Sequence, residues 1–260
     1  MTEETENRPT ILAIAGHDPT GGAGIQADIE TINSLGGHAC SLITALTVQD
    51  SHNLYSSQPV EADLIWRQFS QMRQDFNFKA VKIGLISSPD LIPVLTEIIS
   101  LLPEVPVIVD TVLAAGGGSQ VASEELIRQF KKNLLPQCYL ATPNIPEAQK
   151  LSGKSSTDEC AAKLMQLGCK NMLITGTHED EKNVVNRLYL EKQGKITFES
   201  PRLPYTYHGS GCTISSAISF YLASNHSLTN AVRLAQDFTM KALETADKPG
   251  GGQHFPVRRQ

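Results

Sequence analysis

The chain has 260 residues, a length that favours one large domain over two small ones. Its composition, with 40% hydrophobic and 19% charged residues, is that of a globular protein and excludes a disordered or fibrous chain. A formal net charge of -5 without a block of lysines and arginines argues against a nucleic-acid partner. A small phosphorylated ligand is compatible with this charge, because it needs only a local site.

The cysteines and the N-terminal residues bear on the compartment. Five cysteines are an odd number and show no C-x-x-C spacing, which favours neither a disulfide framework nor a paired zinc site. Residues 1–9 are acidic and polar, and no apolar stretch is long enough to span a bilayer. These features predict a cytoplasmic protein that has no membrane partner.

Short apolar runs alternate with segments of helical period, which is the pattern of α/β folds. Isoleucines at 25, 29 and 32 and apolar residues at 65, 69 and 72 predict two helices, and Ser156 with Glu159 predicts a capping box before a third. The near-continuous apolarity of the intervening runs predicts parallel strands that are covered on both faces. The predicted strands are residues 11–15, 40–46, 80–85, 107–110, 139–142 and 171–175.

The remainder of the chain predicts a hairpin and two helices. Residues 187–190 and 195–198 flank a turn at Gly194, so an antiparallel hairpin is expected at one edge of the sheet. Helices are predicted over 211–224 and 228–246, with Ser227 as the N-cap of the second, and the glycines at 250–252 are expected to be flexible. No linker or internal repeat is visible. We therefore expect a three-layer α/β fold in a single domain, residues 1–260, in which residues 1–9 form a flexible tail.

Ligands of such folds bind where strands end and helices begin. The first junction, from Gly16 to Asp28, follows the first predicted strand, and its glycines permit close approach of a ligand to the backbone. A tight strand-to-helix turn without a ligand is the alternative interpretation. The segment matches neither a Walker A loop nor a G-x-G-x-x-G fingerprint, so it does not by itself predict bound nucleotide phosphates.

The second junction, His208 to Thr213, leads into a predicted helix. Two glycines, a hydroxyl and a helix N-terminus form a cradle for an anion or for a transferring phosphoryl group. Cys212 falls in the first helical turn, where the helix dipole is expected to lower the thiol pKa. Alternatively, Cys212 is a small buried residue that packs behind the turn. A cysteine hydrolase is a weaker alternative, because the closeness of His208 in sequence does not position it as a base.

Two further junctions carry carboxylates. Asn144 follows a predicted strand and Glu147 lies one turn later, so both could converge on a hydrated Mg²⁺ ion. Alternatively, Asn144 caps the helix and Glu147 is a first-turn acid that the helix dipole favours. Asp110 ends another apolar strand, where a buried carboxylate requires a cation or a hydrogen-bond donor, or else caps the following loop.

Several motifs stand in one order along the chain: Gly16-x-Asp18-Pro19-x-Gly21-Gly22-Ala23-Gly24-Ile25-Gln26-Ala27-Asp28, Ile43-Thr44-Ala45-Leu46-Thr47-Val48-Gln49, Lys82-Ile83-Gly84, Thr142-Pro143-Asn144-x-Pro146-Glu147-Ala148 and His208-Gly209-Ser210-Gly211-Cys212-Thr213. Together they resemble the hydroxymethylpyrimidine/phosphomethylpyrimidine kinases of thiamine biosynthesis, a branch of the ribokinase-like superfamily. The resemblance implies transfer of the ATP γ-phosphoryl group, with Mg²⁺, to 4-amino-5-hydroxymethyl-2-methylpyrimidine or its monophosphate. It also implies a homodimer.

The resemblance assigns roles by position. The implied substrate-binding residues are Gly16, Asp18, Gly22, Ala23, Gly24, Asp28, Gln49 and Gly84. The implied anion hole and base are Gly209, Ser210, Gly211 and Cys212. The implied nucleotide-binding residues are Asn144, Thr175, Gly176 and His208, and the implied Mg²⁺ ligands are Asp110 and Glu147. The Gln49 carboxamide offers a donor and an acceptor, which matches the edge of an aminopyrimidine.

The chain departs from the family where a lysine would meet the triphosphate. Residues 114–117 and Thr175 stand where many members carry a lysine, so Arg187, Lys182 or another cation would have to substitute. We therefore expect one of the two phosphorylations to dominate. The alternatives are a pyridoxal kinase, which has the same fold, and a pyrimidine-binding protein without catalysis.

Overall fold

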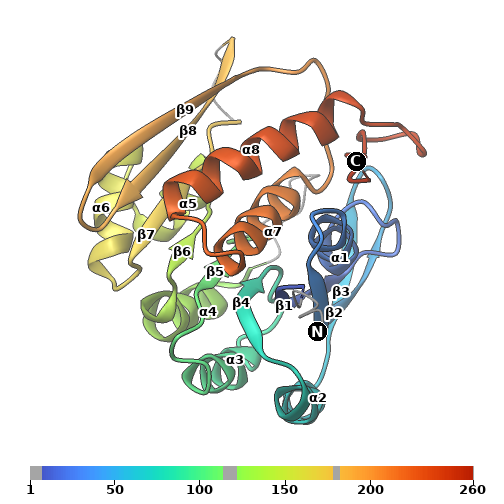
Figure 1. Cartoon of the computed structure of the whole chain (residues 1–260), viewed down its shortest axis with the longest axis vertical. Helices are drawn as coiled ribbons and strands as arrows, with labels where there is room; N and C mark the ends of the chain where they lie inside the picture. The colour runs from blue at the N-terminus through green and yellow to red at the C-terminus, as the bar shows by residue number, and fades with distance from the viewer. Residues whose placement is uncertain (1–7, 114–121, 178–181, 260) are drawn as a thin grey trace, which may run out of the picture.

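A single nine-stranded sheet runs through this computed structural model, which describes residues 8–113, 122–177 and 182–259 (Figure 1). The strand order is β3-β2-β1-β4-β5-β6-β7-β8-β9. Neighbours from β2 to β7 pair parallel, whereas β3, β8 and β9 pair antiparallel. The strands are β1 (Thr10–His17), β2 (His38–Gln49), β3 (Leu54–Pro59), β4 (Phe78–Ile83), β5 (Val107–Val109), β6 (Leu140–Ala141), β7 (Asn171–Ile174), β8 (Asn183–Leu190) and β9 (Gly194–Pro201).

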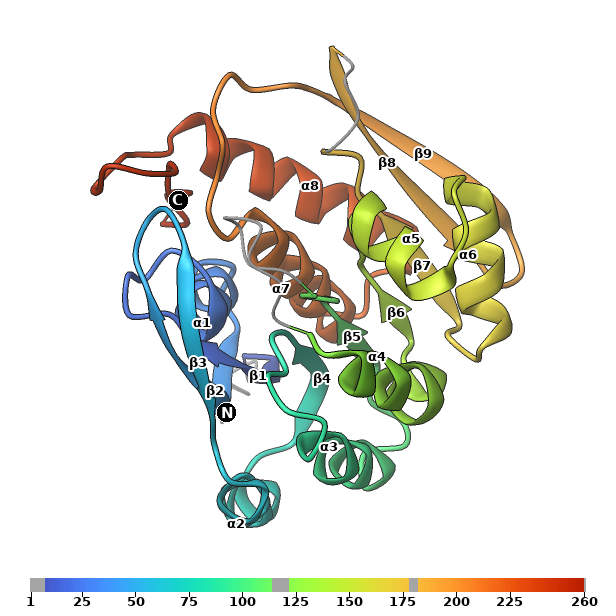
Figure 2. The ribbon, with the colours of Figure 1, turned by 180° about the vertical axis from the view of Figure 1, so that it is seen from behind.

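Helices cover both faces of this sheet, as Figures 1 and 2 show from opposite sides. One face packs on α1 (Gly24–Ser34), α7 (Ser210–Ala223) and α8 (Leu228–Glu244). The other face packs on α2 (Ala62–Asp75), α3 (Leu91–Ser100), α4 (Glu124–Gln129), a π-helical turn (Phe130–Leu134), a 3-10 turn (Leu135–Gln137), α5 (Ile145–Ser152) and α6 (Thr157–Gln166). The predicted three-layer α/β architecture is confirmed.

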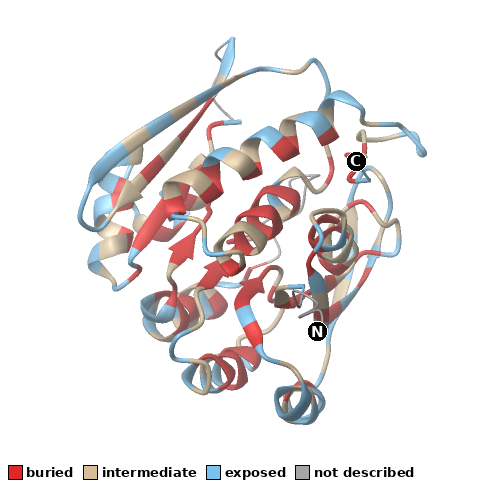
Figure 3. Ribbon diagram, in the orientation of Figure 1, coloured by how far each residue is buried: buried red, intermediate tan, exposed pale blue. Residues whose placement is uncertain are grey.

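The apolar strands explain why two layers of helices are needed. In β1, Leu12 and Ile14 contribute to the core on the α2–α6 side, while Ile11, Ala13 and Ala15 contribute to the core under α7 and α8. Successive side chains of a strand point to opposite faces, so a continuous apolar run must be covered twice. Figure 3 shows the buried residues concentrated in the sheet and on the inner sides of the helices.

Every predicted strand is present, with changes at the ends. The hairpin extends over all of β8 and β9, longer than predicted. Strand β3 was not predicted from the sequence, because its residues are mostly exposed and polar and it lies at the edge of the sheet. Ser227 caps α8 as expected by accepting a hydrogen bond from the Asn230 amide.

The chain crosses from one face of the sheet to the other beside β1. Strands β2 and β4 lie on either side of β1, and the helix that follows β1 packs on the opposite face from the helix that precedes β4. In open α/β sheets a crevice forms at such a switch point, beyond the carboxyl ends of the strands. The ends of β1, β4, β5, β6 and β7 all open onto this edge.

The beginning of the described chain is held to the sheet. The Arg8 side chain donates hydrogen bonds to the carbonyls of Gly36 and Gly37, and the Pro9 carbonyl accepts one from the His38 amide. Arg8 and Pro9 therefore do not belong to a flexible tail, which corrects that part of the prediction for residues 1–9; residues 1–7 lie outside the described residues. Within the described ranges, no helix combines the length and the apolarity needed to cross a membrane.

Candidate active site

A cavity of about 730 Å³ opens at the carboxyl edge of the parallel strands. This volume lies within the range of small-molecule sites. Most of the residues that the sequence singled out line it: Gly16, Asp18, Ala23, Gly24, Gln49, Asp110, Asn144, Glu147, Thr175, His208, Gly209, Ser210, Gly211 and Cys212. The fold thus brings the four predicted junctions together around one space.

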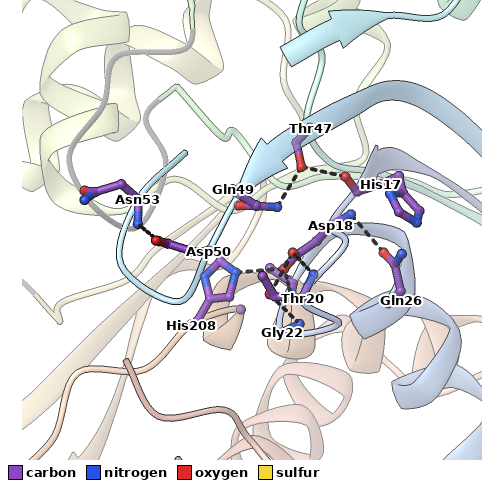
Figure 4. A network of polar contacts seen from close by, with 12 residues as sticks. His17, Asp18, Thr20, Gly22, Gln26, Thr47, Gln49, Asp50, Asn53 and His208 are labelled. Carbon is purple, nitrogen blue, oxygen red and sulfur yellow. Dashed lines mark hydrogen bonds and ion pairs between the residues drawn. The ribbon is translucent and has the colours of Figure 1, made fainter. Parts of the chain in front are cut away.

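Asp18 organises the glycine-rich loop between β1 and α1 (Figure 4). Its carboxylate accepts hydrogen bonds of 2.8 Å from the amides of Thr20 and Ala23 and from the Thr20 hydroxyl. It also pairs with His208 Nε2 at 2.8 Å, although the two residues are far apart in sequence. Burial opposes ionisation of Asp18, but the hydrogen bonds from His208 and Thr20 outweigh it and lower the pKa of this carboxyl. One carboxylate therefore shapes the loop and ties it to the segment before α7.

Two glycines permit close backbone contacts, one within the loop and one between the loop and the start of α7. Gly24 has a φ of +60° and Gly209 a φ of +83°, both in the left-handed region that favours glycine. A Cβ atom on Gly24 would collide with the Gly16 carbonyl, and one on Gly209 would collide with the Gly22 carbonyl. Backbone packs directly against backbone here, which no side chain would permit.

Helix α7 begins at Ser210, so its first amides face the cavity as the sequence predicts. The first N–H groups of a helix have no partner within the helix and carry a partial positive charge. No side chain caps this end, because Gly209 occupies the N-cap position. Ser210, Gly211 and Cys212 therefore form a cradle that suits an anionic group.

The environment of Cys212 differs from the one expected. Desolvation raises the pKa of the thiol to about 12, and the charge of Lys82 opposes this only in part, since Asp110 and Asp28 add to the rise. The direction of this shift is opposite to the one that the helix dipole alone would produce. A second nearby charge would be needed to produce a thiolate at neutral pH.

A buried ion pair lies beneath the cavity. Lys82 on β4 and Asp28 on α1 are both fully buried, and their Nζ and Oδ1 atoms are 2.7 Å apart. The Ser216 hydroxyl on α7 donates a second hydrogen bond, also 2.7 Å long, to the same oxygen. Burial opposes the charge of Lys82, but the nearby negative charges, chiefly that of Asp28, together outweigh it and raise the pKa of this lysine. Together with Ser216, the pair joins β4, α1 and α7 beneath the loops that line the cavity.

The predicted residues that do not line the cavity are Gly22, Asp28, Gly84 and Gly176. Asp28 is occupied by Lys82, and a Cβ atom on Gly84 would lie 2.8 Å from Lys82 Nζ, so Gly84 leaves space for that lysine. These four residues therefore do not line the cavity in the structure, and their assigned contacts with a ligand stay predictions. The Lys82 side chain was missed as a functional residue, although a lysine within an apolar strand is a signal for a buried ion pair.

Asn144 and Glu147 form the capping box of α5. The Asn144 side chain accepts a hydrogen bond from the Glu147 amide at 2.9 Å, and Glu147 accepts one from the Asn144 amide at 3.0 Å. The Glu147 carboxylate also accepts bonds from the Thr111 hydroxyl and the Leu113 amide. Burial, together with the nearby charge of Asp110, raises the pKa of Glu147 to about 8. The alternative interpretation as a helix cap is therefore confirmed for this pair.

Asp110 has an unsatisfied oxygen. Its Oδ2 atom is buried without a hydrogen-bond partner in the described structure, and burial raises its pKa although Lys82 opposes the rise. It lies beside the helix start, since a Cβ atom on Gly211 would be 3.6 Å from Oδ1. Two neighbouring carboxylates with an orphaned oxygen suit a divalent cation that completes its shell with phosphate and water. Asp110 and Glu147 therefore fit Mg²⁺, although no group of three or more metal-ligating side chains occurs in the described residues.

The far side of the cavity contains an arginine that the sequence did not single out. Arg202 follows β9 and lines the cavity near Thr175 and Thr177, and its Nη1 atom donates a 2.9 Å hydrogen bond to the Thr177 carbonyl. The predicted substitutes for the missing lysine, Arg187 and Lys182, do not line the cavity. Residues 114–117, where the second lysine is missing, lie outside the described residues.

The near side carries groups suited to a small ring. Gln49 donates a 2.9 Å hydrogen bond to the Thr47 hydroxyl, which in turn donates a 2.7 Å hydrogen bond to the His17 carbonyl (Figure 4). This chain of bonds orients the Gln49 carboxamide at the cavity wall. Gln253 lines the same region and was not predicted, since nothing in the local sequence marks it.

Comparison with known proteins agrees with this geometry. The sequence pattern of the phosphomethylpyrimidine kinase family matches residues 18–258. The hydroxymethylpyrimidine/phosphomethylpyrimidine kinase of Escherichia coli is 33% identical over 92% of this chain and 92% of its own length. The thiamine biosynthesis bifunctional protein of Geobacter sulfurreducens is 35% identical over 96% of this chain, which spans 52% of that longer protein.

Solved structures show the same fold. An ADP complex of Bacillus subtilis pyridoxal kinase superposes with a TM-score of 0.87 at 28% identity, covering 97% of this chain and 98% of the other. Phosphomethylpyrimidine kinase from Clostridium difficile superposes with a TM-score of 0.79 at 33% identity, covering 91% of this chain and all of the other. The family match over most of the chain and the identity to its members over nearly the full length lead to one conclusion. The chain belongs to the phosphomethylpyrimidine kinase family.

Proposed function

We propose that this protein transfers the γ-phosphoryl group of ATP to 4-amino-5-hydroxymethyl-2-methylpyrimidine, to its monophosphate, or to both. The observation that carries the proposal is the meeting of the glycine-rich loop and the α7 N-terminus in one cavity, joined by the 2.8 Å contact between Asp18 and His208. An anion cradle next to a pocket for a small ring is the arrangement that phosphorylation of a hydroxymethyl group requires.

In this mechanism the chain holds the reactants in line. The amides of Ser210, Gly211 and Cys212 face the transferring group and stabilise the negative charge that develops on its oxygens. The substrate hydroxyl oxygen forms a bond to the γ-phosphorus as the bond from that phosphorus to ADP breaks. The hydroxyl proton passes to the Cys212 sulfur where that sulfur is ionised, and otherwise to an oxygen of the transferred phosphoryl group. Because burial holds the thiol pKa near 12, positioning and charge stabilisation supply most of the rate enhancement.

Asp110 and Glu147 would hold Mg²⁺ at the end of β5 and the start of α5. The bound ion supplies positive charge that neutralises the phosphate oxygens. The orphaned Asp110 oxygen and the raised pKa of Glu147 support this assignment, since a bound cation would satisfy that oxygen and offset the desolvation of both carboxylates.

Gln49 is proposed to bind the pyrimidine edge. Its carboxamide presents a donor and an acceptor, and its bond to Thr47 fixes one orientation at the wall of the cavity. Asn144, Thr175 and His208 line the cavity and are proposed to contact the nucleotide.

Arg202 is proposed to take the place of the family lysine on the nucleotide side. Replacing Arg202 by alanine is expected to raise KM for ATP about 10-fold, the effect of losing one charge-assisted hydrogen bond. The matched control is Lys182→Ala, because Lys182 is exposed nearby but does not line the cavity. An equal rise of KM in both variants would contradict the assignment to Arg202.

The experiment that tests the function is turnover of both pyrimidines with Mg-ATP by the purified protein. Pyrimidine-dependent formation of ADP is expected, with one of the two substrates clearly preferred because the family lysines are absent. Comparable turnover on both substrates would contradict the preference but not the kinase. Binding of the pyrimidine without any ATP consumption would instead identify a non-catalytic binding protein.

Pyridoxal is the second candidate substrate. The observation that favours it is the higher TM-score to a pyridoxal kinase, 0.87, than to a phosphomethylpyrimidine kinase, 0.79. Competition between pyridoxal and the hydroxymethylpyrimidine for the same turnover distinguishes the two, and the pyrimidine is expected to have the higher kcat/KM.

Two further proposals concern the whole molecule. Leu46 and Val48 on β2 and Tyr55 on β3 are exposed apolar side chains, which supports the homodimer that the family resemblance implies. All five cysteines are free, which supports a reducing compartment such as the cytoplasm.

A further inference from the structure

Residues 250–258 pass beside the cavity, which Gln253 lines, and contact the β2–β3 turn and the segment before α7. The amides of Gly252 and Gln253 donate hydrogen bonds of 3.0 and 2.9 Å to the side chain and the carbonyl of Ser51, in the turn between β2 and β3. The amide of His254 donates to the Thr206 carbonyl, and the His254 carbonyl accepts from the His208 amide, both at 2.9 Å. The glycines at 250–252, expected to be flexible, therefore pack on a neighbouring loop.

The same segment next reaches the contact between the glycine-rich loop and α7. The Phe255 ring lies 5.4 Å from the His208 ring, and a Cβ atom on Gly22 would be 2.9 Å from Phe255. The Val257 amide donates a 2.9 Å hydrogen bond to the Ala242 carbonyl on α8. Through these contacts, residues 255–257 bring the end of the chain next to the anion cradle at residues 210–212.

Arg258 occupies the space behind that cradle. Its side chain is almost fully buried, with a relative exposure of 2% for the residue. Nε donates a 2.8 Å hydrogen bond to the Thr213 hydroxyl on α7, Nη2 donates to the Gly22 carbonyl in the loop, and Nη1 lies 3.2 Å from the Glu30 carboxylate on α1. A buried guanidinium requires such partners, and its rigid fork holds all three in one geometry.

The guanidinium lies where the loop and the helix meet. A Cβ atom on Gly209 would be 2.8 Å from Arg258 Nη2 and would also collide with the Gly22 carbonyl. Gly209 is the N-cap of α7, and Gly22 belongs to the loop that Asp18 shapes. Arg258 thus bridges the two backbone segments from the side opposite to the cavity.

We propose that Arg258 is a positioning residue for phosphoryl transfer, one that fixes the distance between the substrate loop and the anion cradle by binding Gly22 and Thr213 at once. This inference rests on the proposed kinase function. Arg258 does not line the cavity and acts only through the groups that it holds. A shift of about 1 Å in such a constellation costs on the order of 100-fold in rate, so loss of the bridge is expected to act mainly on kcat.

The first test compares Arg258→Ala with Arg259→Ala, since Arg259 is the adjacent arginine and is exposed. We expect Arg258→Ala to lower kcat at least about 10-fold, with KM for ATP changed less than about 2-fold, and Arg259→Ala to behave as wild type. Millimolar guanidinium chloride should restore part of the kcat of Arg258→Ala, while sodium chloride of the same ionic strength should not. An unchanged kcat in folded Arg258→Ala would overturn the proposal.

A second pair of variants covers the case in which Arg258→Ala does not fold. Thr213→Val keeps the shape of the side chain but removes its hydroxyl, which accepts from Arg258 Nε and donates a 2.9 Å hydrogen bond to the Gly209 carbonyl. Thr213→Ser keeps both hydrogen bonds, so this pair of variants tests the joint between Arg258 and the start of α7. We expect the valine variant to lower kcat and the serine variant to retain it, at equal thermal unfolding temperatures. Equal kcat in both variants would contradict the positioning role.

A wild-type protein that turns over neither pyrimidine would refute the proposed function rather than the bridge. Hydrogen exchange then tests the bridge directly, because the amides of residues 20–24 and 209–213 should exchange faster when the guanidinium is lost. Acceleration in Arg258→Ala or Thr213→Val, but not in Arg259→Ala or Thr213→Ser, supports the inference, and equal exchange in all variants overturns it.

Discussion

Cys212 shows how strongly the surroundings of a single residue determine its chemistry. Its place in the first turn of α7 favours the thiolate, yet desolvation raises its pKa to about 12. The thiol therefore becomes a base only if a bound cation adds positive charge beside it or offsets the charge of the neighbouring carboxylates. Lys82 is the described cation that opposes this rise of the Cys212 pKa.

Replacing Cys212 by alanine separates catalysis from packing. We expect Cys212→Ala to lower kcat roughly 100-fold, the size of a general-base contribution, while Kd for the pyrimidine changes little. Steady-state kinetics and calorimetric titration measure the two quantities, with Cys212→Ser as the variant that keeps a hydrogen-bonding group. Weaker binding at unchanged kcat would show that the residue only packs behind the turn.

Asp18 predicts how stability depends on pH. Its pKa is lower in the folded state than its ordinary value of 3.8, so the ionised form stabilises the fold above that value. This stability is lost as the pH falls through the folded-state pKa. We expect the free energy of unfolding of wild type to decline more steeply below about pH 4 than that of Asp18→Asn.

Urea unfolding at a series of pH values measures this difference for Asp18→Asn. The control is Asp63→Asn, because Asp63 is exposed on α2 and its ion pair with Arg67 lies at the surface. If the free energy of unfolding changed with pH equally in wild type and Asp18→Asn, the contacts of Asp18 with Thr20 and His208 would make no pH-dependent contribution to stability.

At the scale of the elements, helix α8 depends on its N-cap. The Ser227 hydroxyl accepts the Asn230 amide, and α8 then packs its apolar side on the sheet beside α7. We expect Ser227→Ala to lower the free energy of unfolding by about 1 kcal/mol and Ser227→Gly by only a few tenths. Urea unfolding with an unchanged m-value checks this, and equal effects of the two substitutions would contradict the capping role.

The elements themselves were largely predictable because local pattern determines them. The short apolar runs in β1 and β7 favour buried strands, and the helical period of α1 and α2 leaves one apolar side. Strand β3 escaped prediction because it lies at the sheet edge, where pairing with β2 rather than burial holds polar residues in place. Whether such an edge strand forms depends on pairing with its neighbour and not on the pattern of its own residues.

At the scale of the molecule, the exposed side of β2 and β3 bears on assembly. Leu46 and Val48 are 52% and 61% exposed. If a second copy covers them, Val48→Glu should shift the molar mass measured by light scattering from that of a dimer towards that of a monomer. The control, Gln71→Glu on exposed α2 surface, should leave the dimer intact. A wild-type monomer would contradict the proposed dimer.

A single sheet contains all nine strands, which supports one domain for the described chain, and the net charge of -5 does not conflict with a phosphate site. The amides at the start of α7, and the cation proposed between Asp110 and Glu147, would act locally, within a cavity rather than across the whole surface. The net charge therefore argued against an extended polyanion as a partner, but it did not bear on whether a small phosphorylated ligand binds.

The sequence by itself determined the layers of the fold, the junctions that surround the cavity and the family, because apolar period and loop motifs are local properties. Only the tertiary structure decided that Asp28 pairs with Lys82, that Arg258 bridges Gly22 and Thr213, and that Cys212 is desolvated. Each of these depends on contacts between residues far apart in the chain. Burial and partner distance set the energy of a charge, and both exist only once the chain has folded.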